Sequence, residues 1–266
     1  MTSKLTMTRE NIIADCKQLK LPEIAAMYQL QCDNPAYAEM PFDQRLAMLL
    51  KAETQSRWQK RQQRNIKNAH MPQAHMARLE NMDWDGVRNL NRNLIEQLCE
   101  CTWLTSHLKP WVAIHGATGV GKSFLAKLLT YEACVHGFTA MYYRLPELLS
   151  EIEAARAGGR IINFRKSLLS KQLLVIDEFG VVGMSDENAG EFLTILEQRL
   201  QERSMIIVGQ IPLSSWYDYF TDPVKADAIM DRILNQSYCI EIKGPSMRER
   251  YGAMAQSKES VDAADA

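Results

Sequence analysis

One run of the sequence constrains the fold more than any other. An apolar segment over residues 111–114 leads into a glycine-rich turn over 116–121, and Lys122 and Ser123 then open an amphipathic helical pattern. The spacing is G-x-x-x-x-G-K-S, in the strand–loop–helix context that a phosphate-binding loop requires. Backbone N–H groups and the dipole of the following helix attract phosphate at such a loop. The run therefore predicts a nucleoside triphosphate site.

The loop also predicts individual roles. We expect Lys122 to reach the β- and γ-phosphates and to act in catalysis, and the Ser123 hydroxyl to ligate Mg²⁺. The alternative is a glycine-rich structural turn before a core helix. The complete motif and both flanking elements favour the phosphate-binding loop instead. The expected nucleotide-binding residues are Gly116, Ala117, Thr118, Gly119, Val120, Gly121, Lys122, Ser123 and Phe124.

Composition limits the wider class of protein. The 266 residues are 46% hydrophobic and 24% charged, which is ordinary for a globular protein. A net charge of −1 means that binding to nucleic acid would need a local basic patch. No apolar run is long enough for a transmembrane helix, and the N-terminus lacks the apolar core of a signal peptide. We expect a cytoplasmic protein with no membrane partner.

The six cysteines do not suggest a disulfide framework or a metal site. None forms a C-x-x-C pair, and the chain is not a small secreted scaffold. We interpret them as free thiols of a reducing compartment. Cys99 and Cys101 alone would offer two metal ligands with no partner motif.

The pattern along the chain indicates an α/β core after a helical N-terminal part. Residues 1 to about 105 look helical throughout, with a long helix from about Phe42 and an amphipathic stripe after residue 86. Strands and helices alternate from Trp111, which predicts a parallel sheet with crossover helices. We predict a helical DNA- or partner-binding domain over 1–84, an ATPase domain over 85–250 and a disordered tail over 251–266. The expected strands cover 111–115, 138–143, 173–176, 205–208 and 238–242.

A basic stretch marks the end of the long N-terminal helix. Its bases greatly outnumber its acids between residues 51 and 80, which favours contacts with phosphates. A solvated charged face is the alternative, and it is the usual fate of a charge run. The predicted DNA-binding residues are Arg57, Lys60, Arg61, Arg64 and Lys67.

Two acids complete the predicted site. Asp177 and Glu178 end the apolar strand 173–176, at the sheet edge where parallel sheets bind ligands. We expect Asp177 to hold Mg²⁺, directly or through water, and Glu178 to orient or deprotonate an attacking water. The alternative is a strand end with two solvated acids, which the phosphate-binding loop in the same chain disfavours.

Three further residues are catalytic candidates. Gln210 follows the strand 205–208 and could lie between water and the γ-phosphate, although a glutamine capping a turn before Pro212 remains the alternative. Arg232 and Arg248 could supply positive charge at the γ-phosphate, in one case from a neighbouring subunit. From the residues alone, either arginine could equally be a surface ion pair.

Five segments resemble one family. Gly-Ala-Thr-Gly-Val-Gly-Lys-Ser, Leu-Val-Ile-Asp-Glu-Phe-Gly, Gly-Gln-Ile-Pro-Leu-Ser-Ser-Trp216, Ala226-Asp-Ala-Ile-Met-Asp-Arg-Ile233 and Lys243-Gly-Pro-Ser-Met-Arg248 occur in this order. The pattern resembles the IstB-type transposition helper ATPases, which are AAA+ proteins related to DnaC-type helicase loaders. The resemblance implies an α/β fold: a P-loop AAA+ ATPase core preceded by a small all-helical N-terminal domain.

The resemblance also implies an activity. Gln210 would be a sensor, Arg232 the finger that completes a neighbour's site, and Arg248 a sensor within its own subunit. ATP with Mg²⁺ would drive assembly of a homo-oligomer on double-stranded DNA, and the assembly would stimulate a transposase encoded by the same element in DNA recombination. Gly209 departs from the Ser or Thr usual in the family and puts the sensor's detailed chemistry in doubt.

Other functions remain open at this stage. A DnaC-like replicative helicase loader would use the same ATPase, with the N-terminal part gripping a helicase. A small-molecule kinase would need an acceptor pocket and seldom carries the Asp-Glu strand end. An ATP-binding scaffold with little hydrolysis is favoured only by Gly209.

Overall fold

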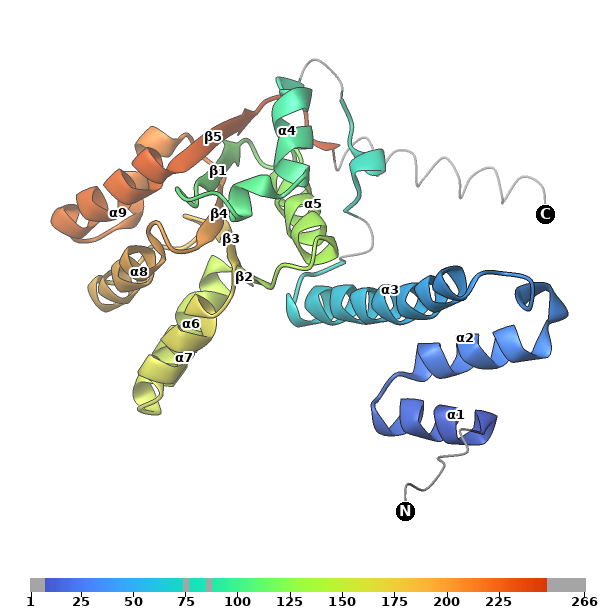
Figure 1. Ribbon diagram of the computed structural model, residues 1–266. Coiled ribbons are helices and arrows are strands. Elements are labelled where there is room, and N and C mark those ends of the chain that lie inside the picture. Colours follow the sequence, from blue (N-terminus) through green and yellow to red (C-terminus); the bar gives the residue numbers. More distant parts are fainter. Residues whose placement is uncertain (1–7, 74–76, 85–87, 248–266) are drawn as a thin grey trace, which may run out of the picture. The chain divides into compact units, whose positions relative to one another are not determined.

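Two compact units make up the chain. The computed structural model describes residues 8–73, 77–84 and 88–247 (Figure 1). The units are Met1–Arg64 and Asn65–Ala266, so the division falls inside a continuous helix, α3 (Phe42–Asn68). The domain boundary predicted between residues 84 and 85 remains a prediction, and the tail predicted over 251–266 lies outside the described residues.

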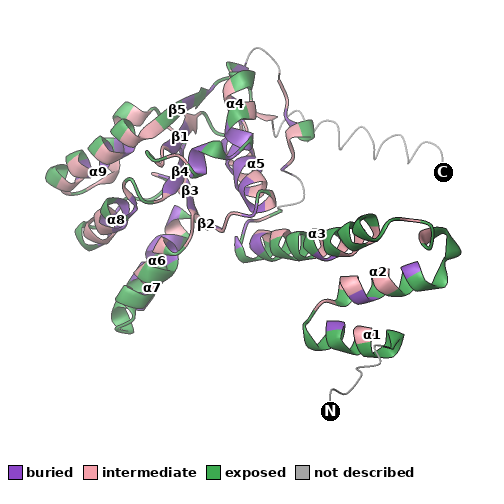
Figure 2. Ribbon diagram, viewed as in Figure 1, coloured by how far each residue is buried: buried purple, intermediate pink, exposed green. Residues whose placement is uncertain are grey.

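The first unit is helical and thinly packed. It contains α1 (Arg9–Gln18), α2 (Pro22–Asp33), the 3-10 helix η1 (Pro35–Tyr37) and most of α3. Proline opens α2 because its fixed φ and missing N–H suit a first helical position. Exposed residues dominate α1 and α3 in Figure 2, and only four described side chains of this unit are buried: Cys16, Ala25, Gln31 and Glu53.

A parallel sheet forms the centre of the second unit. Among the described residues, five strands lie in the order β2-β3-β4-β1-β5, and every pairing is parallel. This confirms the predicted parallel sheet and its five strands. Their bounds are β1 (Trp111–Gly116), β2 (Ala140–Arg144), β3 (Leu173–Phe179), β4 (Ser204–Gly209) and β5 (Ser237–Ile242).

Helices cover both faces of the sheet. α4 (Arg92–Cys99) and α5 (Lys122–Val135) contribute to one hydrophobic cluster, which takes Leu173 and Val175 from β3. α6 (Leu145–Ala157), α7 (Ile161–Leu169), α8 (Asp186–Arg199) and α9 (Pro223–Gln236) contribute to the other, which takes Leu174 and Ile176. Alternate side chains of β3 thus enter opposite layers, as expected for a strand buried on both faces.

The prediction that residues 1–105 are helical throughout is wrong. Between α3 and α4, the described residues form turns and a short 3-10 segment, η2 (Leu79–Asn81). Ala69, Met71 and Met82 are buried in the same cluster as α5, so this segment is held by the core of the second unit rather than by helical periodicity. α4 begins only at Arg92, where the Asn91 side chain accepts a hydrogen bond from the Leu94 N–H and caps the helix.

Short helical turns complete the second unit. η4 (Thr102–Leu104) lies before β1, and η5 (Leu213–Tyr219) lies after β4. η5 has the tighter 3-10 form rather than that of an α-helix. No described helix is both long and apolar enough to cross a membrane.

Candidate nucleotide-binding site

The predicted phosphate-binding loop joins β1 to α5. Gly116, Gly119 and Gly121 have φ of 146°, 86° and 101°, in a region that residues with a Cβ rarely adopt. α5 begins at Lys122, so its first turn lies directly after the loop. The N-terminus of a helix offers unpaired N–H groups and partial positive charge. This end of α5 can therefore receive an anion.

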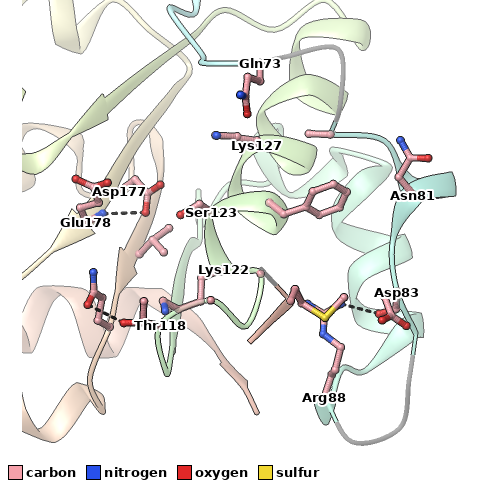
Figure 3. A pocket seen from close by; sticks show the side chains of 17 residues that line it. Gln73, Asn81, Asp83, Arg88, Thr118, Lys122, Ser123, Lys127, Asp177 and Glu178 are labelled. Carbon is pink, nitrogen blue, oxygen red and sulfur yellow. Dashed lines mark hydrogen bonds between the residues drawn. The ribbon is translucent and has the colours of Figure 1, made fainter. Parts of the chain in front are cut away.

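Lys122 lies inside the loop rather than in solvent. Its side chain is buried, and Nζ donates hydrogen bonds to the Gly116 carbonyl at 2.8 Å and to the Ala117 carbonyl at 2.7 Å. The ammonium group is thus held at the centre of the glycine-rich turn, where it also lines a pocket (Figure 3).

Two distant segments hold the loop from outside. The Met247 N–H donates to the Gly119 carbonyl at 2.9 Å. The Arg88 guanidinium donates to the Val120 carbonyl, and also to the Asp83 carbonyl at 2.9 Å (Figure 3). Arg88 is buried, and sequence reasoning missed it because no motif marks it and it lies in a stretch expected to be helical.

The two predicted acids lie at the end of β3. Asp177 is buried: its Oδ1 accepts a hydrogen bond from the Glu178 N–H at 2.8 Å, and its Oδ2 accepts one from the Tyr142 hydroxyl. Glu178 has φ of +60°, and its carboxylate lies 3.6 Å from the Arg144 guanidinium on β2. The two adjacent acids are therefore distinct: Asp177 is fixed inside, whereas Glu178 is partly exposed.

A lysine missed by the sequence analysis lies near these acids. Lys127 is on α5, one turn after Ser123, and lines the same pocket as Asp177 and Glu178 (Figure 3). Burial lowers the pKa of its ammonium group, and the charge of Asp177 opposes that effect. Its spacing from Ser123 on the helix was the available signal.

Gln210 contacts the phosphate-binding loop. Its Oε1 accepts a hydrogen bond from the Thr118 hydroxyl at 3.1 Å, which joins the end of β4 to the loop after β1. Packing against Trp216 explains why a glycine stands at position 209. A Cβ at Gly209 would lie 2.3 Å from the ring of Trp216, which is fully buried and donates its indole N–H to the Ile211 carbonyl at 2.9 Å.

One pocket of about 730 Å³ brings most of these residues together. It lies wholly within the second unit, and its volume falls in the range of small-molecule sites. The predicted residues that line it are Thr118, Gly119, Gly121, Lys122, Ser123, Phe124, Asp177, Glu178 and Gln210. Polar lining residues that the sequence analysis missed are Gln73, Asn81, Asp83, Arg88 and Lys127. Gly116, Ala117 and Val120 belong to the loop without lining the pocket.

Arg232 is not among the described residues that line this pocket. Arg232 lies on α9, where its guanidinium is 2.7 Å from the Glu197 carboxylate and donates to the Ala228 carbonyl at 2.6 Å. Arg248 lies outside the described residues.

The predicted DNA-binding residues on α3 are all exposed, but they differ in their partners. Arg57 pairs with Glu53 at 2.8 Å, and Lys60 lies 3.4 Å from Glu23 of α2. Glu53 and Glu23 therefore neutralise these two bases, which a count of bases and acids along residues 51–80 does not show. Within the described residues, no acid lies at ion-pair distance from Arg61, Arg64 or Lys67; the last of these belongs to the second unit.

The pocket has oxygen donors suited to Mg²⁺. The Ser123 hydroxyl and the Asp177 carboxylate both line it, and hard cations prefer such ligands. In the described parts of the chain, no group of three or more His, Cys, Asp or Glu side chains could hold a metal ion. Mg²⁺ is usually bound by one or two protein groups together with water and substrate phosphates, so Ser123 and Asp177 could hold it.

The cysteines are free thiols, as predicted. Burial raises the pKa of Cys99, Cys101 and Cys134 to about 12, so these thiols stay protonated at neutral pH. Cys99 and Cys101 are thus buried side chains of the core.

Strand order, loop and acidic strand end together define a P-loop α/β protein. The chain belongs to the family described as IstB-like ATP binding protein, whose model matches residues 14–255. This confirms the family resemblance derived from the five sequence segments.

Relatives and solved structures agree with this assignment. Two proteins of Sinorhizobium fredii, y4pL and y4uH, are named as insertion sequence ATP-binding proteins. The first is 34% identical over 76% of this chain and 81% of its own length. The second is 33% identical over 87% of this chain and 92% of its own length. The crystal structure of DnaI has a TM-score of 0.56 at 22% identity, and covers 65% of this chain and 95% of its own. The similarity to the DnaI structure shows the fold alone.

Proposed function

We propose that this protein is an ATP-dependent, DNA-binding AAA+ ATPase that assembles on duplex target DNA and stimulates or directs a partner transposase. One observation carries the proposal: in a chain of the IstB-like family, the phosphate-binding loop, Asp177, Glu178 and Gln210 line a single pocket. A site that only binds a triphosphate would need no more than the phosphate-binding loop. The additional acids and amide are what hydrolysis of a triphosphate requires.

Each residue of the pocket has a role in the proposal. Lys122 binds the β- and γ-phosphates, and Ser123 and Asp177 hold the metal ion. Mg²⁺, when bound, neutralises charge on the phosphates. Glu178 orients or deprotonates the attacking water, and Gln210 contacts the γ-phosphate from the end of β4. Arg232 and Arg248 are proposed as the finger for a neighbouring site and the sensor within the subunit.

Contact with DNA is proposed for α3. Arg61 and Arg64 of the first unit are exposed without an ion-pair partner among the described residues, so they are available to phosphates. Arg57 and Lys60 can contribute once they leave Glu53 and Glu23. The names of the relatives, which refer to insertion sequences, support a transposase as the partner.

The test is whether DNA binding depends on ATP. Fluorescence anisotropy of labelled duplex DNA is measured with ATP, with ADP and without nucleotide, over a range of salt. We expect tight binding only with ATP, weakening steeply with salt. Glu178→Gln should bind ATP, retain the DNA-bound oligomer and lose hydrolysis. DNA affinity that is equal in all three nucleotide states would contradict the proposal.

A helicase loader is the second candidate, because DnaI and the DnaC helicase loader share the fold of the second unit, with TM-scores of 0.56 and 0.53. A loader would retain a hexameric helicase in a pull-down and would not stimulate a transposase encoded beside it. The two outcomes separate the candidates directly.

A further inference from the structure

Tyr142 makes a polar contact with a residue of the proposed metal site. It lies on β2 opposite Val175 of β3, two positions before the level of Asp177, and its side chain is buried. The ring packs in the cluster that contains α5, and the hydroxyl reaches Asp177 Oδ2. An ionised carboxylate can only accept hydrogen bonds, so the tyrosine hydroxyl is the donor.

Both oxygens of the Asp177 carboxylate are therefore occupied by a donor. The Glu178 N–H holds Oδ1 at 2.8 Å, and the Tyr142 hydroxyl holds Oδ2. Two bonds at the two ends of a planar group fix its rotation about the side-chain torsion. The lone pairs that remain must then face a set direction. Figure 3 shows the Asp177 carboxylate on the side of β3 that faces Ser123.

We propose that Tyr142 is a positioning residue for the metal ion: its hydroxyl holds Asp177 in the orientation in which that carboxylate and Ser123 share one cation. This inference rests on the proposed function, in which Asp177 and Ser123 hold Mg²⁺. Of the two donors, only Tyr142 can be removed by substitution, because the other is a backbone N–H. Donors behind a metal ligand commonly set metal affinity about 10–100-fold.

The neighbouring residue provides a matched control. Tyr143 is next on the same strand, and its hydroxyl donates to the Glu151 carboxylate of α6 at 2.8 Å. Tyr143→Phe and Tyr142→Phe thus remove the same atom from the same strand, and each breaks one bond to a carboxylate. Only Tyr142 bonds to the carboxylate that lines the pocket.

The experiment measures nucleotide binding rather than turnover. Affinity for a fluorescent ATP analogue is measured first in EDTA and then against increasing Mg²⁺. Tyr142→Phe should match the wild type within about twofold in EDTA but need about tenfold more Mg²⁺ to reach the half-maximal effect. Tyr143→Phe should match the wild type in both conditions. Equal Mg²⁺ midpoints for the two variants would overturn the inference.

Two further variants make the result decisive. Tyr142→Met also removes the donor while filling the core, and carries the same expectation should Tyr142→Phe fail to show a cooperative thermal transition. Asp177→Asn tests the assignment beneath the inference. If Asp177→Asn keeps the wild-type Mg²⁺ midpoint, the proposed metal site itself is wrong. If Asp177→Asn loses the Mg²⁺ response while Tyr142→Phe keeps the wild-type midpoint, only the role of Tyr142 is overturned.

Discussion

Arg199 lies at the end of α8 with no exposed surface. Its guanidinium donates to the carbonyls of Leu168 at 2.9 Å, Lys171 at 3.1 Å and Ser204 at 2.7 Å. These carbonyls belong to the end of α7, the turn after it and the start of β4. One side chain therefore joins the end of α7 and the turn after it to the start of β4 by donating to their backbone carbonyls.

Removing this side chain should destabilise the second unit strongly. Arg199→Ala removes a hydrogen-bond donor from each of these carbonyls and leaves the space of a buried side chain empty, and each buried group that is left without a partner costs about 1–3 kcal/mol. We expect the free energy of unfolding to fall by at least about 3 kcal/mol, measured by urea denaturation. Arg156→Ala, which removes an exposed guanidinium on α6, is the control and should change stability by about 0.5 kcal/mol or less. Similar losses for the two variants would contradict this account.

The cysteines offer a second test at the residue scale. Because burial raises the pKa of Cys99, Cys101 and Cys134 to about 12, their thiolate fraction at pH 8 is very small. We expect iodoacetamide to label the exposed Cys32 readily in the folded protein and to leave these three unlabelled until urea is added. Peptide mass spectrometry gives the extent at each position. Fast labelling of Cys101 without urea would show that this part of the core opens easily.

The end of α3 is the element on which the DNA proposal depends. Arg61 and Arg64 differ from Arg57 and Lys60 because no described acid pairs with them. Arg61→Ala with Arg64→Ala should lower DNA affinity at least about tenfold and reduce the slope of log affinity against log salt by about 2, since each phosphate contact contributes about 0.9. Anisotropy titrations at four salt concentrations measure both quantities.

A charge-matched pair elsewhere controls for the loss of two positive charges. Arg156→Ala with Lys166→Ala removes two bases from α6 and α7, which the proposal does not place near DNA. This pair should leave the salt slope unchanged. If both double variants lower the slope equally, α3 has no special role.

The elements also show which parts of the fold a sequence can predict. The three central strands, β3, β4 and β1, were predictable because each is an apolar run buried on both faces, and a parallel sheet needs such runs. The structure of the segment between α3 and α4 could not be predicted in this way. Its buried residues contact partners far along the chain. The Ala69 carbonyl, for example, accepts a hydrogen bond from the Tyr142 N–H at 2.9 Å. A periodicity measured over one window carries no information about such partners.

The same limit applies to the site. The loop and the two acids could be predicted because each is a short motif with a fixed spacing in the sequence. In the structure they line one pocket. The Tyr142 hydroxyl and the Arg88 guanidinium act on Asp177 and Val120 from other strands and segments, so no local pattern marks them. Glu23 likewise reaches Lys60 from a separate helix, which is why the charge of α3 was overestimated.

At the scale of the whole molecule, the proposed finger predicts complementation between inactive proteins. Lys122→Ala removes nucleotide binding but keeps Arg232, whereas Arg232→Ala keeps the pocket and removes the finger. Each alone should have little ATPase activity. When the two are mixed, sites of the Arg232→Ala subunit that lie beside a Lys122→Ala subunit regain an arginine, so activity should exceed the sum of the two proteins.

The mixing experiment has a clear opposite outcome. A control mixture combines Lys122→Ala with Glu178→Gln. Both changes lie in the same pocket, so neither protein can supply what the other lacks, and the mixture should stay inactive. If the first mixture is as inactive as the control, Arg232 acts within its own subunit or only pairs with Glu197, as it does in the single chain.

The contact between Gly209 and Trp216 also restricts how this chain can diverge. A Cβ at position 209 would lie 2.3 Å from the indole ring, so even alanine cannot enter while the ring keeps its place. A lineage that acquires serine or threonine before Gln210 must therefore first exchange the tryptophan or shift its ring. The opposite order passes through a protein with overlapping atoms. The two positions should be inherited as a pair, with the ring changing first.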